Sequence, residues 1–461
     1  MNVEGVASDS GAFARLRESV SFRLAVPAGL VLLLQIPIAL IDGTIAERRT
    51  TRNAAFAEVS ATWGGAQQLV GPVLTVPVVE PSANGPETVA PRRFFPRTVS
   101  VRGRVDTEVR RRGIFDIPLY VARLHVEGTF AAPVETHSGI LWNRASVALG
   151  VSDAKTIRAA TPISLGDRKL PWEPGVGDAA FLESGVQAAV PFPAPPVGAI
   201  PFAFDLTLAG SGRLAVVPAG DETVVTLASA WRDPGFDGAS LPVERRIGAS
   251  GFEATWRTMN LGRGFPASWT NPQEVTRERL AASAMSVSFL SPVDTYRTNE
   301  RAVKYQLLFL GLTFFAFVLF ELLAPLRIHP VQYLLVGFAL CLFYLLLLPF
   351  SEHFGFTRAY AIAAADVVVL VTGYVRFVLR KGSRALALGG FLAVLYAFLF
   401  VLLQIQEYAL LVGSIGLFLL LSGVMWFTRH VDWYALGSPP PAAKVSERAD
   451  LSSAAPWSDG R

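Results

Sequence analysis

The sequence predicts an integral membrane protein: one N-terminal transmembrane helix, a large mostly-β extracytoplasmic domain, and a C-terminal α-helical bundle. Two observations predict this fold class. Apolar residues concentrate near residues 22–42 and again over about 302–428, whereas the stretch between is rich in Pro, Gly, Arg, Asp and Glu. Only 17% of residues are charged, compared with about a quarter in soluble domains. A chain of 461 residues has room for both parts.

The first predicted span is Phe22–Ile41, which is long enough to cross a bilayer as a helix. A cleaved signal peptide is the alternative. The apolar run is longer than a usual signal-peptide core, and no small-residue cleavage site precedes the polar segment AERRTTR. We therefore predict a signal anchor over residues 22–42, preceded by a cytoplasmic segment, 1–21. A helical continuation over Thr44–Trp63 ends at two glycines.

About five further spans follow in the C-terminal part, which brings the expected total to about six. They are Ala302–Leu323, Val331–Leu348, Ala359–Leu379, Ala385–Leu403 and Tyr408–Phe427. An even number of spans places both termini on the same side of the membrane.

Lys and Arg in the short loops predict the orientation, because cytoplasmic loops carry an excess of both. Basic residues precede the first span, occur at Arg327, cluster over 376–384 and recur at Arg429, whereas loops 350–357 and 404–408 have none. We expect both termini in the cytoplasm, residues 43–301 outside, which is the periplasm if the cell is a two-membrane bacterium, and a cytoplasmic tail over 429–461 with a disordered end.

The segment 43–301 shows the signals of short β-strands. Residues 74–80 alternate in hydropathy, and Leu119–Phe130 places Tyr120, Ala122, Leu124, Val126 and Phe130 on one face. The clearest predicted hairpin runs from Phe204 through Gly210-Ser211-Gly212 to Val216. These strands predict a β-sandwich or an elongated sheet. The single cysteine, Cys341, lies in an apolar segment, so the exposed domain has no disulfide.

Several stretches, in this order, resemble a known family along nearly the whole chain. They are QLVGP (68–72), GSGRLAVVPAG (210–220), the spaced run of Trp231, Pro234, Phe236, Leu241-Pro242, Gly251-Phe252 and Trp256, RAVKY (301–305), LTFFAFVLFE (312–321), RIHPVQYLLVG (327–337), FYLLLLPFSEHFGF (343–356) and RHVDWYAL (429–436). The chain resembles the CreD family of inner membrane proteins, the cell envelope integrity or colicin-tolerance proteins. The resemblance implies a protein whose loss or excess alters envelope properties, in a regulon answering to a two-component sensor. It implies no enzymatic activity and no established ligand.

The sequence predicts no catalytic residue, metal site or cofactor. Phosphate-loop, HExxH and paired-cysteine motifs are absent, and the five histidines are scattered. One S-x-x-K sequence, Ser152 to Lys155, falls in a predicted strand and turn, where the two side chains do not meet. The net charge of +4 is small, so no nucleic-acid partner is expected. The run Arg110–Arg112 indicates either a solvated strand or turn, or a site for an acidic headgroup or polymer.

Four polar residues in or near the helical bundle are the candidate functional residues. Asp366 lies inside a span, where it either lines a proton or solute path, pairs within the bundle, or sits nearer the interface than the predicted boundaries place it. Glu321 ends a span as an ion-pair partner or interfacial anchor. Glu352 and His353 form a short outer loop, which either seats the β domain or binds something passing by; His353 is also a candidate pH sensor.

Two function classes remain open at this point. In the first, a non-enzymatic protein of the bacterial inner membrane contributes to envelope integrity and stress response, and its β domain binds or senses a periplasmic protein, lipid or glycan. In the second, the bundle carboxylates serve a transporter or channel. No internal helix repeat supports the second class. A membrane-embedded hydrolase is the most distant alternative. The sequence predicts no oligomeric state.

Overall fold

The computed structural model describes residues 20–80, 88–131, 139–177, 182–289, 295–323, 328–379, 382–405 and 408–429. The chain divides into two compact units: a helical unit, Met1–Asp42 with Thr298–Arg461, and a β unit, Gly43–Arg297. The predicted cytoplasmic segment before residue 20, the basic residue Arg327 and the predicted tail after Arg429 lie outside the described residues.

Five described helical segments are long and apolar enough to cross a membrane, or six when one bent helix pair is counted as a span. That pair joins Thr295–Lys304 to Gln306–Glu321 at an angle of 44°. The helices are α2 (Val20–Leu33), α3 (Gln35–Trp63), α4 (Arg277–Ser283), α5 (Thr295–Lys304), α6 (Gln306–Leu323), α7 (Pro330–Phe354), α8 (Phe356–Leu379), α9 (Gly382–Gln404) and α10 (Ala409–Thr428). The predicted fold class, about six apolar helices with a large mostly-β domain after the first, is confirmed.

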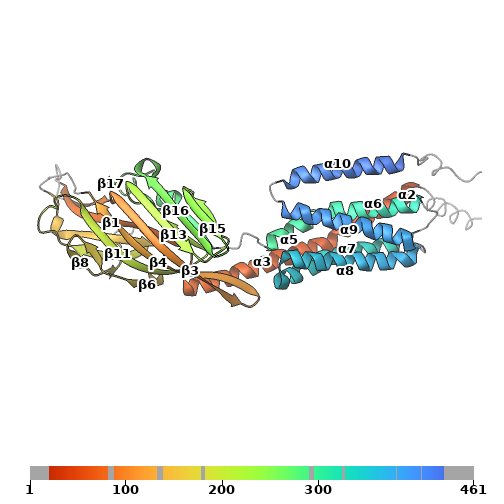
Figure 1. Cartoon of the computed structure of the whole chain (residues 1–461), viewed down its shortest axis with the longest axis horizontal. Helices are drawn as coiled ribbons and strands as arrows, with labels where there is room; N and C mark the ends of the chain where they lie inside the picture. Colours follow the sequence, from red (N-terminus) through yellow and green to blue (C-terminus); the bar gives the residue numbers. More distant parts are fainter. Residues whose placement is uncertain are drawn as a thin grey trace, which may run out of the picture. The chain divides into compact units, whose positions relative to one another are not determined.

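Within the helical unit, α7 packs against α8, α8 against α9, and α2 against α6 and α7 (Figure 1). Gln306 donates to the side-chain oxygen of Gln35 at 2.6 Å, which joins α6 to the start of α3. Gly337 of α7 permits the close approach of Leu34, since a Cβ atom at position 337 would lie 2.3 Å from Leu34 Cδ1. Close helix contact at small residues is typical of membrane bundles.

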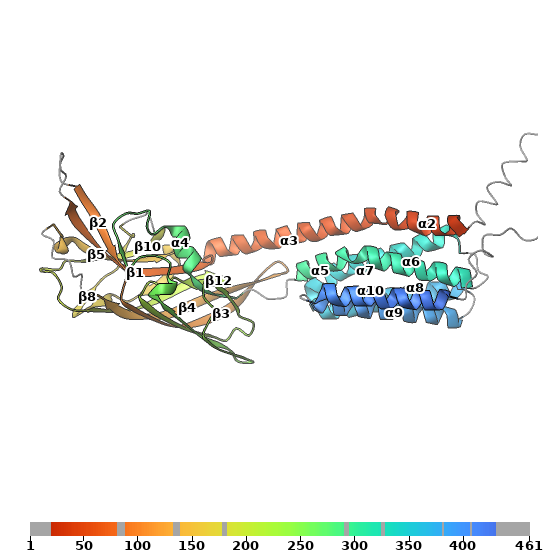
Figure 2. The same cartoon turned by 90° about the horizontal axis from the view of Figure 1, so that it is seen from above.

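Helix α3 is continuous from Gln35 to Trp63, as Figure 2 shows, and confirms the helical continuation over Thr44–Trp63. Its C-terminal part belongs to the β unit and is fastened there by polar contacts. Ser60 and Ser211 hydroxyls lie 2.7 Å apart in a buried contact. Glu58 pairs with Arg112 at 2.6 Å. The Trp63 ring lies under the guanidinium of Arg110, 4.3 Å from its centroid.

The β unit contains two nine-stranded sheets. Sheet A consists of β1 (Gln67–Glu80), β2 (Thr88–Phe94), β5 (Ala145–Val151), β9 (Glu173–Pro174), β10 (Ser184–Val190), β12 (Arg213–Val216), β14 (Gly235–Gly238), β17 (Ser268–Trp269) and β18 (Met285–Ser288). Sheet B consists of β3 (Thr98–Arg112), β4 (Phe115–Phe130), β6 (Ile157–Ala160), β7 (Ile163–Leu165), β8 (Arg168–Leu170), β11 (Ile200–Ser211), β13 (Glu222–Ser229), β15 (Glu244–Gly248) and β16 (Gly251–Met259).

The main core lies between the two sheets and takes apolar residues from both. Strand β4 illustrates the period-two pattern, since the five residues predicted to share a face (Tyr120, Ala122, Leu124, Val126 and Phe130) are all at most 2% exposed. Their neighbours in the core include Val99 and Val101 from β3 and Leu149 from β5. The predicted sandwich is therefore correct.

A second, smaller core covers the other face of sheet A. It combines sheet residues such as Val73 and Ala148 with Phe95, Phe265 and Trp269. At its rim, the buried side chain of Arg263 donates to the carbonyls of Phe265 and Ala219, both at 3.1 Å, and pairs with Asp221 at 3.2 Å. Burial lowers the pKa of Arg263, and the Asp221 carboxylate opposes that shift.

The predicted hairpin around Gly210-Ser211-Gly212 is wrong. Strand β11 ends at Ser211 in sheet B, and β12 begins at Arg213 in sheet A, where it pairs with β1 and β18. Gly212, with φ of +70°, makes the crossing from one sheet to the other. A glycine-rich turn satisfies the local requirement for a hairpin and for a crossing equally well, so the long-range partners decide.

Candidate functional site

Asp366 lies near the middle of α8, and its side chain is exposed. The buried face of α8 carries Ala359, Ala363, Val367 and Val371 instead. Among the residues that the structure describes, none makes a hydrogen bond or ion pair with Asp366. The expectation that Asp366 faces the interior of the bundle, or pairs inside it, is therefore wrong for this part of the chain.

Glu321 lies near the end of α6, is 8% exposed, and accepts a hydrogen bond from the Tyr333 hydroxyl of α7 at 2.9 Å. The Tyr333 ring packs edge-on against Phe314, with the centroids 5.8 Å apart, and also against Phe317. This contact fastens α6 to α7. Glu321 is thus a buried carboxylate with a neutral donor. The ion pair expected for it is not found among the described residues, and its alternative role as an interfacial anchor stays a prediction.

Glu352 and His353 belong to the last turns of α7, which continues to Phe354, so their expected placement in a loop is wrong. Only Gly355 separates α7 from α8. The His353 ring is exposed, and its Nδ1 lies 2.9 Å from the carbonyl oxygen of Pro349 on the same helix. Asp366, Glu321 and His353 come from different faces or ends of the bundle helices, and no hydrogen bond or ion pair among the described residues joins any two of these three side chains.

The S-x-x-K sequence has a structural role in the β unit. The Ser152 hydroxyl accepts a hydrogen bond from the backbone N–H of Gln68 at 2.9 Å. Asp153 caps a short 3-10 turn by accepting from the N–H of Lys155. The residues therefore close a strand end, and Lys155 is exposed. The run Arg110–Arg112 is the exposed end of β3, in agreement with a solvated strand.

The outward side of sheet B carries many exposed polar and charged side chains. We call the outward-pointing residues of β3, β4, β11, β13, β15 and β16 the open face. Along β3 the inward residues Val99, Val101 and Val105 are buried, whereas Arg102 and Arg104 are exposed. No second core covers this side among the described residues, in contrast to sheet A. The open face is therefore available to a ligand.

Polar and charged side chains form a row across three strands of the open face. The strand register places Arg102 of β3 beside His125 of β4, and His125 beside Asp205 of β11. Arg102 pairs with Glu127 at 2.8 Å, and His125 Nδ1 lies 2.7 Å from Asp205. The other ring nitrogen of His125 lies 3.6 Å from Glu127. Cross-strand pairs of this kind stabilise a sheet modestly and hold the side chains in place.

A hollow of about 500 Å³ lies at one end of the open face. Its charged residues are acidic, Glu127 and Glu222, and hydroxyl groups surround them. The hydroxyls of Thr98 and Thr129 lie 2.8 Å apart across β3 and β4. We call this the acidic hollow. Its carboxylates and hydroxyls offer hydrogen-bond acceptors to a cationic or hydroxyl-rich ligand.

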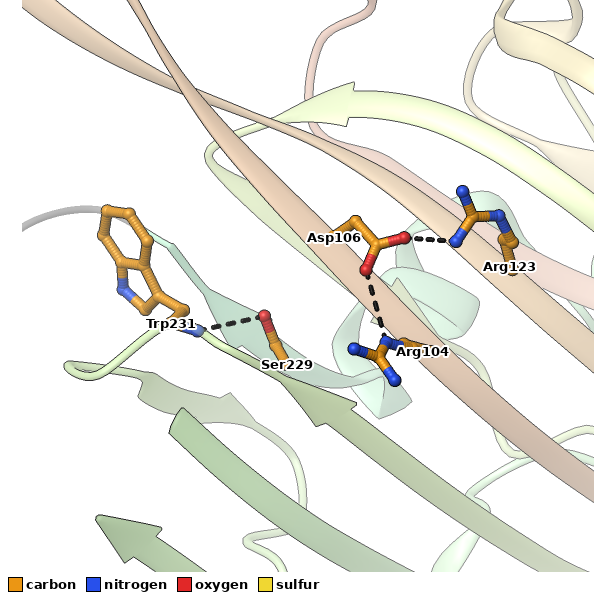
Figure 3. A network of polar contacts seen from close by, with 5 residues as sticks. All are labelled: Arg104, Asp106, Arg123, Ser229 and Trp231. Atoms are coloured by element: carbon orange, nitrogen blue, oxygen red, sulfur yellow. Dashed lines mark hydrogen bonds and ion pairs between the residues drawn. The ribbon is translucent and has the colours of Figure 1, made fainter. Parts of the chain in front are cut away.

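A second hollow, of about 450 Å³, lies on the same sheet around Arg104, Arg246 and Ser229. Figure 3 shows its border: Asp106 binds the guanidinium groups of both Arg104 and Arg123, and Ser229 accepts from the N–H of Trp231 at 3.2 Å. Arg246 pairs with Glu253 at 3.6 Å. We call this the arginine hollow. Guanidinium groups fit carboxylates and phosphates.

Sequence reasoning missed both hollows. The alternation of charged with apolar residues in VSVRGRVD (99–106) was the available signal, because it marks one polar face of a strand. It does not reveal which strands lie beside β3. Among the described residues, no group of three or more His, Cys, Asp or Glu side chains is arranged to hold a metal ion.

Comparisons with known proteins place the chain in a family. Two solved structures of an M1 zinc metallopeptidase from Deinococcus radiodurans give TM-scores of 0.21 and 0.19 at 9% and 8% identity. The matches cover 42% and 36% of this chain and 42% and 38% of the peptidase chains, and similarity this low supports no conclusion. The inner membrane protein CreD of Escherichia coli (strain K12) is 33% identical over 456 residues, which are 94% of this chain and 98% of the relative. The family model described as "Inner membrane protein CreD" matches residues 19–434. The chain therefore belongs to the CreD family of multi-pass inner membrane proteins.

Proposed function

We propose that this protein is a non-enzymatic component of the inner membrane that supports envelope integrity under stress, and that its β unit binds an envelope component. The termini lie in the cytoplasm and residues 43–301 in the periplasm, as the distribution of Lys and Arg in the short loops favours. The bound component is a periplasmic protein, lipid or glycan that carries both acidic and basic or hydroxyl groups.

The open face with its two hollows is the observation that supports this proposal most. The acidic hollow includes Ser100 of β3, and the arginine hollow includes Arg104 of the same strand. Four residues of a strand span about 13 Å. One extended ligand with separated charges is long enough to reach both hollows. On the opposite side of the sandwich the second core covers sheet A, and the hollow beside it is smaller, about 180 Å³.

The transporter alternative gains less support from the geometry. A path for ions or protons needs polar side chains that follow one another through the bundle. Asp366 is exposed at the side of α8, and Glu321 is engaged by Tyr333. These two carboxylates do not share a route within the described helices. Geometry also supports the non-enzymatic part of the proposal. The Ser152 hydroxyl and the backbone N–H of Lys155 form hydrogen bonds that close the end of a strand.

The test replaces arginines in the full-length chain and measures rescue of a deletion strain. Arg104→Glu combined with Arg246→Glu reverses the charge of both arginines in the arginine hollow. This variant should fail to restore the normal response of the deletion strain to detergent, colicin or β-lactam. Arg245→Glu is the control for each single substitution: it reverses one charge, as Arg246→Glu alone does, on the neighbouring residue of β15, which does not line the hollow. Immunoblots of membrane fractions must show equal amounts of every variant.

The outcome separates the two function classes. Loss of rescue in the hollow variant alone, with Arg245→Glu intact, supports ligand binding at the open face. Full rescue by the hollow variant contradicts the proposal. If Glu321→Gln removes rescue and the hollow variant retains it, the bundle performs the function, and the transporter alternative replaces the proposal.

A further inference from the structure

An acidic side chain occupies the membrane-facing side of the bundle at mid-depth. Asp366 is ten residues beyond Phe356, the first residue of α8, in a helix that is long and apolar enough to span the membrane. At 1.5 Å per residue this is about 15 Å, or half of the roughly 30 Å hydrocarbon core. Asp366 therefore lies near the bilayer midplane, and its side chain points away from the buried face of α8.

The surface around Asp366 has the spacing of a helix-packing seam. Ile362, Asp366, Val369 and Gly373 follow one another at intervals of four, three and four residues, and all four are exposed. This alternation places residues along the line where two helices meet. A Cβ atom at Gly373 would meet no other atom within 4 Å, so an approaching backbone has room there. The seam is built like an interface, yet no described helix of this chain occupies it.

Contact with lipid chains alone is energetically unfavourable for this seam. A carboxyl group at the centre of a bilayer is costly, and such groups in membrane proteins pair with other polar groups. Asp366 has no such partner among the described residues. The basic residues of α8, Arg358 and Arg376, stand eight and ten residues away along the helix, near its two ends. A partner from outside the chain would supply the missing group.

A second copy of the chain supplies no opposite charge at this depth. In a two-fold dimer with its axis along the membrane normal, α8 meets α8 of the other copy at equal depth, so Asp366 would face Asp366. Arg358 and Arg376 would likewise face their own copies. No Lys or Arg occurs in the middle of any predicted span that could take the place of these partners. Charge complementarity therefore favours a different membrane protein.

We propose that the α8 seam docks a transmembrane helix of another membrane protein, and that a Lys or Arg near the centre of that helix pairs with Asp366. The apolar seam residues, Ile362 and Val369, pack against the partner helix, and Gly373 permits the close approach. This interface belongs to the helical unit and does not depend on ligand binding at the open face.

The test measures association of the full-length chain with synthetic helices in phosphatidylethanolamine/phosphatidylglycerol vesicles. One probe is a Leu-rich transmembrane peptide with a single central Lys, and the other is the same peptide with Leu at that position. Energy transfer from a dye at an introduced Ser383→Cys, in a Cys341→Ala background, to a dye on the peptide reports binding. The native chain should bind the Lys peptide about tenfold more tightly than the Leu peptide, as expected for one interhelical polar contact. Asp366→Leu should abolish this preference.

A matched control moves the carboxylate within the bundle. Asp366→Leu combined with Val394→Asp places it at mid-helix on α9, where Val394 is 70% exposed. Loss of the preference in this variant supports the α8 seam as the site. Equal preference in the transplanted variant shows that any exposed carboxylate suffices and overturns the seam. Equal binding of both peptides by the native chain also overturns the proposal. Energy transfer between differently labelled native chains that Asp366→Leu removes would identify a second copy as the occupant and contradict the proposal.

Discussion

At the scale of single residues, the buried Tyr120 connects the two sheets of the β unit through one hydrogen bond. The Tyr120 hydroxyl, in a side chain that is 1% exposed, donates to the carbonyl oxygen of Arg213 at 2.7 Å and thereby ties sheet B to sheet A. Its ring packs against Phe289, with the centroids 5.1 Å apart. Burial raises the pKa of the Tyr120 phenol, while a backbone hydrogen bond involving Gln67 opposes the shift.

We expect this tyrosine to make the β unit sensitive to alkaline pH. Because the folded-state pKa of Tyr120 is raised, its contribution to stability is complete below pH 10 and declines above that value, where the unfolded chain ionises first. The decline is at most about 1.4 kcal/mol per pH unit. Tyr120→Phe should cost about 1 kcal/mol at pH 7, through loss of the hydrogen bond, but should lose less between pH 10 and 11 than the native chain.

Urea unfolding of the detergent-solubilised protein, followed by tryptophan fluorescence at pH 7, 10 and 11, measures this difference. The other buried tyrosines are present in both proteins, so the comparison isolates position 120. Identical pH dependence of the two midpoints would show that Tyr120 titrates normally in the fold.

At the scale of elements, the long β3–β4 pair forms the centre of sheet B and carries the charged rows of the open face. Gly128 of β4 pairs with Val99 of β3. A Cβ atom at position 128 would lie 2.0 Å from the Thr98 carbonyl oxygen and 2.6 Å from Phe202 Cζ. The strands can approach this closely only because position 128 has no side chain.

Gly128→Ala should therefore destabilise the β unit by about 1–3 kcal/mol, since backbone must move to relieve the overlap. For a domain of this size, that corresponds to a fall in melting temperature of several degrees, at about 2–4 °C per kcal/mol. Gly65→Ala is the matched control, because a Cβ atom there would have no neighbour within 4 Å. Thermal melting by tryptophan fluorescence checks both; an unchanged Gly128→Ala transition would mean that the strands separate without cost.

The features that the sequence predicted correctly are those that depend on local residue patterns. The period-two pattern of Leu119–Phe130 identified the inward face of β4, and the apolar runs located the spans. Strand partners were not predictable, because the Gly210-Ser211-Gly212 turn fits a hairpin, whereas β12 pairs with β1 and β18 from distant parts of the chain. For the same reason the sequence could not place Arg246 of β15 near Arg104 of β3.

The candidate residues of the bundle show a different limit. Both faces of α8 are apolar, so hydropathy does not distinguish the buried stripe through Ala363 and Val367 from the exposed one through Ile362 and Val369. The side on which Asp366 lies follows from contacts with α7 and α9. Glu352 and His353 were assigned to a loop because the apolar run ends before them, but hydrogen bonding carries α7 on to Phe354.

At the scale of the whole molecule, the proposed orientation determines which residues meet the periplasm. In a Cys341→Ala background, we expect Arg111→Cys in the β unit to react with a membrane-impermeant maleimide in cells with a permeabilised outer membrane. Arg111 is exposed, with 80% of its side-chain surface accessible. Ser383→Cys, in the basic loop between the predicted spans Ala359–Leu379 and Ala385–Leu403, should react only after lysis. The reverse labelling pattern would show that the basic loops face outward.

The strand order of sheet A has a consequence for biogenesis. Strand β1, which starts at Gln67, lies between β12 and β5, and β12 in turn needs β18, which ends at Ser288, on its other edge. At roughly 5–20 residues per second, synthesis of that interval takes on the order of ten seconds or more. Until β12 is made, one edge of β1 lacks its partner, and until β18 is made, one edge of β12 lacks its partner. Unpaired strand edges promote aggregation. We therefore expect sheet A to be completed only when nearly the whole β unit has emerged.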